Sequence, residues 1–443
     1  MALFQIEGRR ALRGLLRAGG RKNSALGVLP AVLLGEAPVR IDNVPLIADV
    51  AVMGQMLRSA GASVEADGEH ALCIRPAAFG PSPIDAECAN RLRASYYLLG
   101  ACLGRFGQAD VPMPGGCDIG ARPIDQHLKG FVAMGAEVEV AHGRIRARAR
   151  RLHGAHIYLD VTSVGASINL MLAAVGAEGT TVIENAAKEP HVVDVATLLL
   201  AMGASVVGAG TDVIKIRGRA TLHGCQHTLI PDEIEAATYM IAAAGTGGDV
   251  VVENVIPRHL EPVAAKLGEA GAEVTVAAES IRVRGPDRCR AANVKTLPYP
   301  GFPTDAQQPM TALLATASGT STVTETIWDS RFRFADELVR MGARIRVEGR
   351  VAVVEGVPAL GGAPVRATDL RGGAGLILAG LFAEGRTEVD AGDYVDRGYE
   401  HMETKLRSLG ADIRRVDRVA SGPTGSAGAP RSAAGCPPIR ESR

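Results

Sequence analysis

The sequence has few aromatic residues and no excess of charge of either sign. Phenylalanine, tryptophan and tyrosine make up 4% of the 443 residues, so the core has to be built from aliphatic side chains. Lysine and arginine number 48, as do aspartate and glutamate, which gives a formal net charge of zero. This balance argues against a dedicated nucleic-acid binder, because phosphate contacts need a basic surface.

Long apolar runs and a targeting segment are also missing. No stretch approaches the roughly 18 apolar residues of a membrane span, and the opening residues MALFQIEGRR lack the apolar run of a signal peptide. The seven cysteines form no CxxC pair and no Cys/His cluster, which makes disulfides and structural zinc unexpected. We therefore expect a cytoplasmic protein with no metal, no nucleic-acid partner and no membrane partner.

Glycine, in contrast, is abundant and marks an internal repeat. A helix-like end, a Gly-Ala pair and an alternating strand recur six times, 68 to 74 residues apart. The six glycines are Gly61, Gly135, Gly203, Gly271, Gly342 and Gly410. A glycine directly after a helix is the expected left-handed C-cap, and the segments that follow alternate as half-buried strands do.

A second recurring phrase lies between these glycines. It is an apolar helix of small residues, a turn and a β-branched strand, clearest from Ala166, Ala237 and Ala374. Helices that are apolar all round are expected to be buried. Each unit thus combines helices and strands, and the predicted fold class is α/β.

The number of units leaves two architectures open. A six-unit solenoid is one, but its units usually span only about 20–50 residues. Units of about 70 residues favour the other, two compact lobes of three units each. A cleft between two similar lobes is a common place for a ligand site.

Residues 112–125, PMPGGCDIGARPID, predict a substantial loop. They combine three prolines, three glycines and a cysteine, and loops on rigid scaffolds often carry function. Cys117 lies at the centre, and a nearby guanidinium, Arg122, would stabilise a thiolate. The local sequence leaves a structural turn with an incidental thiol equally open.

Cationic residues precede several of the apolar helices. Lys22 lies directly before one, where backbone N–H groups favour an anion, although a capped helix with a solvated basic start is the simpler alternative. The segments with Arg371 and Arg397 each put an aspartate and an arginine just before a buried helix. One such pair is usually an exposed ion pair of little energy, but several at equivalent helix starts favour convergence on an anionic substrate.

Ordered motifs along the chain make a family recognisable. They are Lys22-Asn23, PGGCDIGARPIDQH (114–127), DVTSVGAS (160–167), IENAAKEP (183–190), YPGFPTDAQQP (299–309), TETIWDSRF (324–332), ATDLR (367–371) and DRGYE (396–400). In this order they closely resemble the enolpyruvyl transferase family, in particular its members that use UDP-N-acetylglucosamine as acceptor. The resemblance covers about residues 3–416.

The resemblance implies a fold. It is a two-lobed inside-out α/β barrel of six βαβαββ repeats, three in each lobe. One lobe would span residues 22–230, and the other would join 1–21 to 231–419. Residues 420–443 extend past the end of the family, and their composition predicts a disordered tail.

The resemblance also implies a reaction. The enolpyruvyl group of phosphoenolpyruvate would move to the 3-hydroxyl of UDP-N-acetylglucosamine through a tetrahedral ketal, with release of phosphate. This is the first committed step of peptidoglycan synthesis, and so serves cell-wall growth and cell division. No cofactor and no obligate protein partner is implied, and the partners are the two small-molecule substrates.

Site residues follow by resemblance from the matching motifs. Cys117 is implied as the proton donor to phosphoenolpyruvate, on a loop that acts as a lid, and as the thiol that phosphoenolpyruvate or its epoxide analogue fosfomycin modifies covalently. Asp305 is implied as base or orienting acceptor for the sugar hydroxyl. The implied phosphoenolpyruvate contacts are Lys22, Asn23, Arg122, Arg371 and Arg397, of which Lys22 and Arg397 are also catalytic. The implied UDP-N-acetylglucosamine contacts are Asn23, Arg93, Arg122, Pro123, Ile124, Asp125, Gln126, Ser163, Val164, Gly165, Asp305 and Ile327.

Four positions depart from the commonest family pattern. Val161 and Glu233 stand where lysine and arginine are frequent, and Phe334 and Tyr394 where histidine is frequent. They leave two other hypotheses open. One is enolpyruvyl transfer to another nucleotide such as UMP in specialised metabolism, and the other is a catalytically silent paralogue that binds the nucleotide sugar. Retention of the implied catalytic residues argues against the second.

Overall fold

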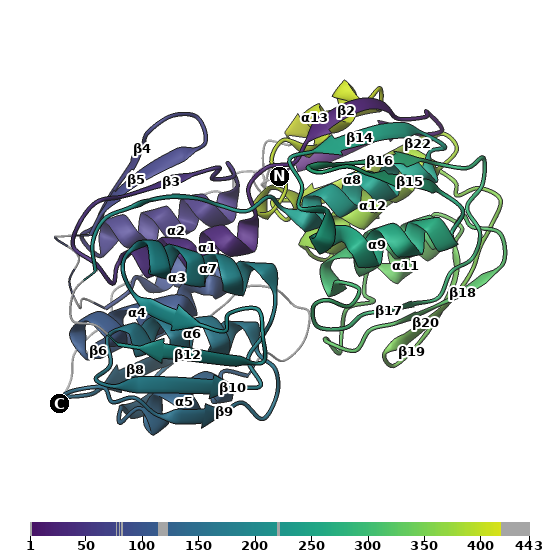
Figure 1. Cartoon of the computed structure of the whole chain (residues 1–443). Coiled ribbons are helices and arrows are strands. Elements are labelled where there is room, and N and C mark those ends of the chain that lie inside the picture. The colour runs from purple at the N-terminus through teal and green to yellow at the C-terminus, as the bar shows by residue number, and fades with distance from the viewer. Residues whose placement is uncertain are drawn as a thin grey trace, which may run out of the picture.

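The structure is a computed structural model that describes residues 2–76, 78, 80, 83–113, 123–218 and 222–417. These residues form two lobes that lie side by side (Figure 1). Within the described ranges the strands form six sheets, five of four strands and one of three. The expected α/β fold of repeated units is confirmed.

The lobe drawn in purple to teal in Figure 1, here called lobe one, holds three sheets. Their strand orders are β13 (Gln226–Thr228), β3 (Val39–Asp42), β5 (Ala71–Arg75), β4 (Ser63–Ala66); β6 (Gln108–Pro112), β8 (Arg144–Arg148), β7 (Glu137–Ala141); and β11 (Ser205–Val207), β12 (Val213–Arg217), β10 (Thr180–Glu184), β9 (His156–Tyr158). The helices are α1 (Lys22–Val32), α2 (Ala48–Ser59), α3 (Ala86–Arg91), the 3-10 helix η1 (Arg93–Tyr96), α4 (Tyr97–Phe106), α5 (Asp125–Ala133), α6 (Val164–Val175) and α7 (Pro190–Ala201).

Lobe two holds the other three sheets. Their strand orders are β15 (Glu273–Val276), β16 (Ser280–Arg284), β14 (Asp249–Glu253), β2 (Arg13–Arg17); β17 (Val294–Lys295), β18 (Thr320–Thr324), β20 (Val351–Glu355), β19 (Arg344–Glu348); and β21 (Pro364–Arg366), β22 (Arg386–Gly392), β1 (Ala2–Glu7), β23 (Asp412–Asp417). The helices are α8 (Glu233–Gly245), α9 (Pro257–Glu269), the 3-10 helix η2 (Thr304–Ala306), α10 (Gln307–Leu314), α11 (Ala335–Arg340), α12 (Leu370–Phe382), the 3-10 helix η3 (Val395–Arg397) and α13 (Met402–Ser408).

Three sheets are completed by a strand from a distant part of the chain, and in one of them β2 pairs in parallel with β14. In lobe one, β13 pairs in parallel with β3, although almost the whole lobe separates them in sequence. In lobe two, β1 pairs antiparallel with both β22 and β23. Each lobe is therefore closed by joining the two ends of its own set of units.

One repeat departs from the implied βαβαββ pattern. The sheet of β6, β8 and β7 has no parallel partner strand among the described residues, and α3 lies in the preceding segment. Asp85 accepts hydrogen bonds from the backbone N–H groups of Glu87 and Cys88. A side chain that caps a helix in this way favours a helix start over a strand.

The six repeat glycines share one backbone conformation. Their φ angles lie between 89° and 101°, a region that residues with a Cβ rarely adopt. The prediction of a left-handed residue after each helix is confirmed. In each of the six repeat units, one helix is thus followed by a glycine in the same left-handed conformation.

The apolar helices form the interior. Every residue of α12 is buried, and α6 is buried from Ala166 to Val175, as their all-round apolar sequences predict. Small residues allow close packing, since a Cβ on Gly100 of α4 would lie 2.2 Å from the carbonyl oxygen of Asn169 in α6. Buried apolar residues form one core between residues 25 and 229 and another from 2–18 and 236–413.

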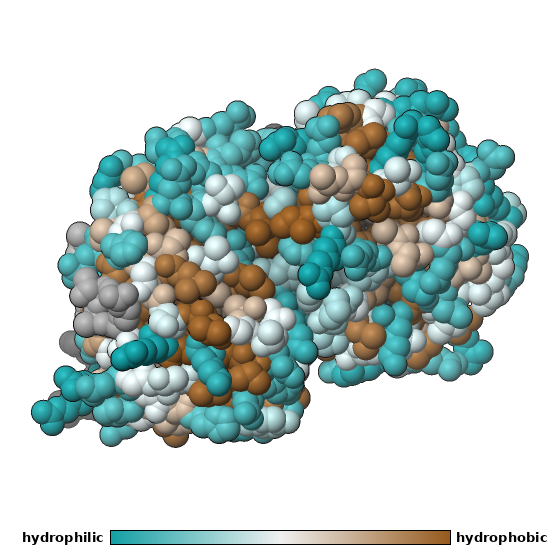
Figure 2. All heavy atoms as spheres, in the orientation of Figure 1, coloured by the Kyte–Doolittle hydropathy of each residue, from teal (hydrophilic) through white to brown (hydrophobic). Residues whose placement is uncertain are grey.

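The outer surface is mostly polar on the face shown in Figure 2, with hydrophobic residues visible on both lobes and at their junction. Among the described residues no helix is long and apolar enough to cross a membrane. The two passages of the chain between the lobes are paired by hydrogen bonds. Arg21 N donates to Ile230 O at 2.8 Å, and Asp232 N donates to Gly19 O at 2.9 Å.

Candidate active site

The start of α1 lies against charged residues from both lobes. Lys22, the first residue of the helix, places Nζ 2.7 Å from Oδ2 of Asp49 in α2. Arg397 of η3, in lobe two, donates from Nε to Oδ1 of the same carboxylate at 2.8 Å and from Nη2 to Oδ2 at 3.3 Å. Asp49 thus ties together two of the cations expected to bind phosphoenolpyruvate.

Burial and neighbouring charges oppose each other in this group. Burial would raise the pKa of Asp49, but the charge of Lys22 and the hydrogen bonds from Arg397 hold that pKa below its usual range. Burial lowers the pKa of Lys22, and the charges of Arg371 and Arg397 add to this shift although Asp49 resists it. Crowded, desolvated cations of this kind favour an anionic ligand.

Asp305, in η2, lies between two arginines of lobe two. Arg331 donates from Nη2 to Oδ1 at 2.6 Å, and Arg371 at the start of α12 donates from Nη2 to Oδ2 at 3.2 Å. Burial would raise the pKa of Asp305, but these guanidinium groups hold it far below its usual range. In this arrangement Asp305 is a weak base and a good hydrogen-bond acceptor.

Glu325 shapes the loop beside Asp305. Its Oε1 accepts hydrogen bonds from the backbone N–H groups of Ile327 at 2.8 Å and Trp328 at 3.2 Å. Its Oε2 accepts from Oγ1 of Thr304 at 2.8 Å. Because Thr304 directly precedes Asp305, one buried carboxylate positions both Asp305 and the Ile327 backbone.

The two clusters act on each other. The charge of Lys22 contributes to the low pKa of Asp305, and the charge of Arg371 acts on Lys22. Together they contain the cations Lys22, Arg331, Arg371 and Arg397 and the carboxylates Asp49 and Asp305. Converging cations from several elements suit a small anionic ligand. Asn23 lies beside Lys22 in the first turn of α1.

The segments predicted to bind the nucleotide meet in lobe one. Gln126 of α5 accepts from the backbone N–H of Asp160 at 2.9 Å and donates to Oδ2 of Asp160 at 3.1 Å. This links residues 123–126 to the segment before α6, where Oγ of Ser163 caps the helix by accepting from Ala166 N at 3.2 Å. The first turn of α6, with Val164 and Gly165, offers backbone N–H groups to an anion.

Gly165 also allows close packing around this turn. A Cβ at this position would lie 2.8 Å from Oη of Tyr96 and 3.0 Å from Nε2 of His127. Burial, with a smaller effect from the charge of Arg93, lowers the pKa of His127 to about 4, so this histidine is neutral at pH 7. Arg93 lies in η1, with its guanidinium carbon 6.0 Å from the centre of the Tyr96 ring.

Two residues of the predicted site, Cys117 and Arg122, lie outside the described residues, and so does the predicted tail 420–443. The described cysteines are all free thiols, and burial raises the pKa of Cys102 to about 12 and that of Cys289 to about 11. Neither of these two is a ready nucleophile, because the reactive form is the thiolate.

The departures from the family pattern have different surroundings. Val161 is 60% exposed, just before α6, and Tyr394 is 38% exposed beside η3. Phe334 is fully buried and stacks on Phe332 with the ring centres 6.5 Å apart. Glu233 forms a buried ion pair with Arg21.

Three residues of the site were not assigned from the sequence. Asp49 has a weak signal, a single acid within the otherwise apolar start of a helix, IADVAVMG. Arg331 and Glu325 lie inside the recognised motif TETIWDSRF. Their pairing with Asp305 and Thr304 depends on a loop whose path the local sequence does not reveal.

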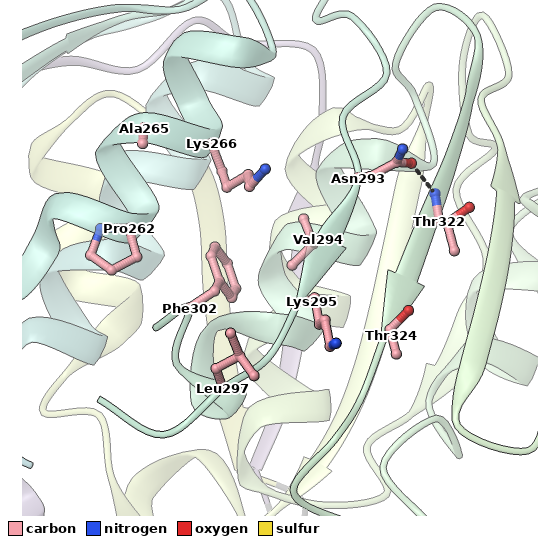
Figure 3. Close-up of a pocket in the computed structure, with 10 residues that line it drawn as sticks. All are labelled: Pro262, Ala265, Lys266, Asn293, Val294, Lys295, Leu297, Phe302, Thr322 and Thr324. Carbon is pink, nitrogen blue, oxygen red and sulfur yellow. Dashed lines mark hydrogen bonds between the residues drawn. The ribbon is translucent and has the colours of Figure 1, made fainter. Parts of the chain in front are cut away.

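Two cavities lie away from these clusters. One of about 560 Å³ lies between α9 and the strands β17 and β18, and Lys266, Lys295 and Phe302 are among the residues that line it (Figure 3). The other, of about 700 Å³, is lined mostly by polar residues including Arg148 and Arg150. None of the described residues predicted to bind substrate lines either cavity.

Comparison with known sequences places the chain among the carboxyvinyltransferases. The family model of EPSP synthase (3-phosphoshikimate 1-carboxyvinyltransferase) matches residues 6–406. UDP-N-acetylglucosamine 1-carboxyvinyltransferase 3 of Caldanaerobacter subterraneus subsp. tengcongensis is 57% identical over 416 residues, which cover 94% of this chain and 100% of the relative. UDP-N-acetylglucosamine 1-carboxyvinyltransferase 2 of Bacillus anthracis is 55% identical over 415 residues, 94% of this chain and 97% of the relative.

Solved structures agree with this comparison. The enolpyruvyl transferase NikO from Streptomyces tendae is 30% identical, with a TM-score of 0.84 over 94% of this chain and 98% of that one. The EPSP synthase of Acinetobacter baumannii is 22% identical, with a TM-score of 0.71 over 94% of this chain and 100% of that one. At that identity the second likeness bears on the fold alone.

Proposed function

The chain belongs to the enolpyruvyl transferase family, and from this membership we infer that it transfers the enolpyruvyl group of phosphoenolpyruvate to UDP-N-acetylglucosamine. The observation that carries this conclusion is the 57% identity, over both lobes, to a relative named for that reaction. Phosphate is the second product. The reaction opens peptidoglycan synthesis, and because both substrates are cytoplasmic metabolites, we propose the cytoplasm as its location.

We propose that the two lobes are the two halves of the substrate cleft, with boundaries at 22–230 and at 1–21 with 231–419. The separate cores and the paired passages near Gly20 and Pro231 support this division. Asp49 and Arg397 come from opposite lobes. A substrate bound beside them would therefore touch both halves.

We assign phosphoenolpyruvate to the cations around the start of α1. Its carboxylate and phosphate need converging positive charge, which Lys22, Arg371 and Arg397 supply from a desolvated setting. Arg331 belongs to the same set, since it shares Asp305 with Arg371. Asn23 and Arg122 complete the assignment by resemblance.

The acceptor is assigned to two regions. Arg93, the segment 122–126 and the start of α6 would hold the uridine diphosphate, and the linked starts of α5 and α6 support this. Asp305 and the backbone of Ile327 would hold the sugar from lobe two. Glu325 supports this part because it positions both.

The proposed chemistry has two steps. In the addition, the 3-hydroxyl oxygen bonds to C2 of phosphoenolpyruvate while C3 takes a proton, which we assign to the Cys117 thiol. Asp305 orients the hydroxyl by accepting its hydrogen bond. As the new C–O bond forms, the hydroxyl proton becomes strongly acidic, so even a weakly basic carboxylate takes it.

The elimination reverses part of this change. C3 returns a proton to the Cys117 thiolate, the double bond to C2 forms again, and the bond from C2 to the phosphate oxygen breaks. Phosphate leaves with the bonding electrons. The cations that bound phosphoenolpyruvate stabilise the phosphate as it departs.

The acceptor can be tested directly. Phosphate release from phosphoenolpyruvate is measured with UDP-N-acetylglucosamine, UMP or shikimate 3-phosphate as the second substrate. We expect turnover with the nucleotide sugar alone. Turnover with UMP alone would establish the specialised-metabolism alternative, and nucleotide-sugar binding without any phosphate release would establish the silent paralogue.

A further inference from the structure

Residues 397–400 belong to lobe two but lie directly against lobe one, and are here called the bridging segment. Its first residue, Arg397, holds the carboxylate of Asp49 with a hydrogen bond of 2.8 Å. Its second residue is a glycine, and a Cβ on Gly398 would lie 3.2 Å from Cδ of Lys22. The backbone of the bridging segment therefore packs on the stem of the lysine that we assign to phosphoenolpyruvate.

Glu400, the last residue of the bridging segment, makes a second contact with lobe one. Its Oε2 accepts a hydrogen bond from the backbone N–H of Leu46 at 3.1 Å, across 354 positions of the sequence. Its Oε1 lies 3.7 Å from Nε2 of His70, which directly precedes β5. Since the Glu400 side chain is only 11% exposed, its carboxylate is largely enclosed where the lobes meet.

The part of lobe one that receives Glu400 is itself held in place. Val44 N donates to the carbonyl oxygen of His70 at 2.9 Å, and Nδ1 of His70 lies 3.1 Å from the carbonyl oxygen of Val44. Leu46 follows two residues later, and Asp49 lies in the first turn of α2. The start of α2 thus holds the bridging segment at two points, one at each end of that segment.

Tyr399 fixes the bridging segment to its own lobe. The tyrosine is 1% exposed, and its Oη shares a hydrogen bond of 2.9 Å with Oγ1 of Thr238 in α8. The guanidinium carbon of Arg371 lies 5.1 Å from the centre of the Tyr399 ring. The bridging segment therefore contacts three of the cations that we assign to phosphoenolpyruvate, namely Lys22, Arg371 and its own Arg397.

The Glu400 contact lies beside a passage of the chain between the lobes. A Cβ on Gly19 would lie 3.8 Å from Oε2 of Glu400. A Cβ on Gly20 would overlap with the carbonyl oxygen of Asn43, three residues before Leu46. When two bodies rotate about their connection, the points next to that connection move least, so this contact can persist while the cleft opens and closes.

We propose that Glu400 is a positioning residue whose hydrogen bond to Leu46 holds the bridging segment on lobe one and so keeps Arg397 beside Lys22. Glu400 acts on phosphoenolpyruvate through these two cations. Small misplacements of binding groups carry large kinetic penalties. This inference rests on the proposed function, because the assignment of phosphoenolpyruvate gives the two cations their ligand.

Three variants at one position test the role of the hydrogen bond. Glu400→Ala removes the acceptor and should lower kcat/KM for phosphoenolpyruvate by about tenfold, through a higher KM. Glu400→Gln keeps an acceptor oxygen at the same reach and should stay within about twofold of the wild type. Glu400→Asp keeps the charge on a shorter side chain, and should behave like the alanine variant. Equal rates in all three variants and the wild type would overturn the proposal.

Glu388→Ala is a matched control. Glu388 accepts a hydrogen bond from Nε2 of Gln5 at 3.0 Å, and both residues lie in lobe two. This variant should leave the KM of both substrates unchanged. In Glu400→Ala the KM for UDP-N-acetylglucosamine should also stay within about twofold, since general damage to the fold would affect both substrates.

Hydrogen exchange measured by mass spectrometry reports the contact itself. In Glu400→Ala the peptide that contains Leu46 should exchange faster than in the wild type, because its N–H loses the acceptor. Glu388→Ala should not show this change. Unchanged exchange in Glu400→Ala would contradict the contact, and faster exchange with an unchanged kcat/KM for phosphoenolpyruvate would contradict the positioning role.

Failure of the proposed function would look different. If the wild-type protein released no phosphate with any acceptor, the proposed reaction would be wrong. Exchange in residues 44–49 and 395–400 would still report whether Glu400 holds the bridging segment. Faster exchange of both peptides in Glu400→Ala would support that contact, and faster exchange of neither would refute it.

Discussion

Arg397 in lobe two donates a 2.8 Å hydrogen bond to Asp49 in lobe one, across 348 positions of the sequence. The same carboxylate holds Lys22 at 2.7 Å. The relative position of the two cations that we assign to phosphoenolpyruvate is therefore set by an acid that need not touch the substrate. We infer that Asp49 is a positioning residue, so its loss should displace Lys22 and Arg397 rather than remove a substrate contact.

Asp49→Asn should lower kcat/KM for phosphoenolpyruvate by about 10–100-fold, because small misplacements of binding groups carry penalties of that size. Steady-state kinetics with both substrates varied would measure it. Arg282→Gln, which removes an exposed ion pair to Asp249, should change neither kcat/KM nor Tm noticeably. Equal behaviour of the two variants would speak against a positioning role.

Asp305→Ala should reduce turnover by about 10³-fold, within the range for loss of an acid-base group. Asp305→Asn keeps an acceptor oxygen and should retain more activity than the alanine variant. Since Arg331 and Arg371 hold the pKa of Asp305 far below its usual range, its ionisation should not appear in the rate profile above pH 5. Wild-type rates in folded Asp305→Ala would remove the residue from the mechanism.

Fosfomycin should add to one thiol per chain, at Cys117. Mass spectrometry after incubation with UDP-N-acetylglucosamine would detect the adduct. The raised pKa values of Cys102 and Cys289 disfavour reaction there. Cys117→Asp should keep turnover and give no adduct, because a carboxylic acid donates a proton but forms no thioether. Modification of a different cysteine in the wild-type protein would contradict the assignment.

The contribution of Glu233 to stability should fall as the pH rises from about 4.5 to about 7. Burial raises the pKa of Glu233 to about 7 from its ordinary 4.5, so the folded protein binds more protons than the unfolded chain between these values. Asp49 has a lowered pKa, and its contribution is lost only as the pH falls through that lower value. Buried His127 and His191 have lowered pKa values and act in the opposite direction in both proteins, so the measurement is a difference. Urea unfolding at pH 5, 6, 7 and 8 should show the stability of the wild type falling relative to that of Glu233→Gln. Parallel curves for the two proteins would refute this.

Gly165→Ala should raise the KM for UDP-N-acetylglucosamine by about tenfold, because the added methyl group would lie 2.8 Å from Oη of Tyr96 and force the start of α6 to shift. Gly268→Ala is a matched control, since a Cβ there meets nothing within 4 Å. The KM for phosphoenolpyruvate should be unaffected in both variants. A Gly165→Ala protein with unchanged acceptor KM would show that the turn adapts.

The repeat was accessible from the sequence because it depends on local rules. A glycine at a helix end and a helix that is apolar on every side can each be recognised from a few neighbouring residues. The positive φ angles of Gly61 and Gly410 confirm the predicted helix ends. The capping of α3 by Asp85 is also local, yet the repeat pattern concealed it. The βαβαββ pattern that the resemblance implies does not anticipate this helix, although the capping residue before it favours one.

Long-range pairings could not be read in the same way. Nothing near Asp49 identifies Arg397, and nothing near Arg21 identifies Glu233, since each pair joins elements that meet only when the lobes have formed. Motif resemblance singled out Asp305 and Lys22 but did not supply their partners. The ion pairs of the site could therefore be identified only from the structure.

The strand β1 has a consequence for how the protein is made. It lies between β22 and β23, so its neighbours leave the ribosome only after nearly the whole chain. At roughly 5–20 residues per second, residues 2–7 wait tens of seconds for the strands on either side. Lobe one, whose closing strand β13 ends at Thr228, has all its strands while that wait continues. Synthesis thus orders the two lobes in time, and the sheet of lobe two that contains β1 cannot form until the flanking strands β22 and β23 have been made.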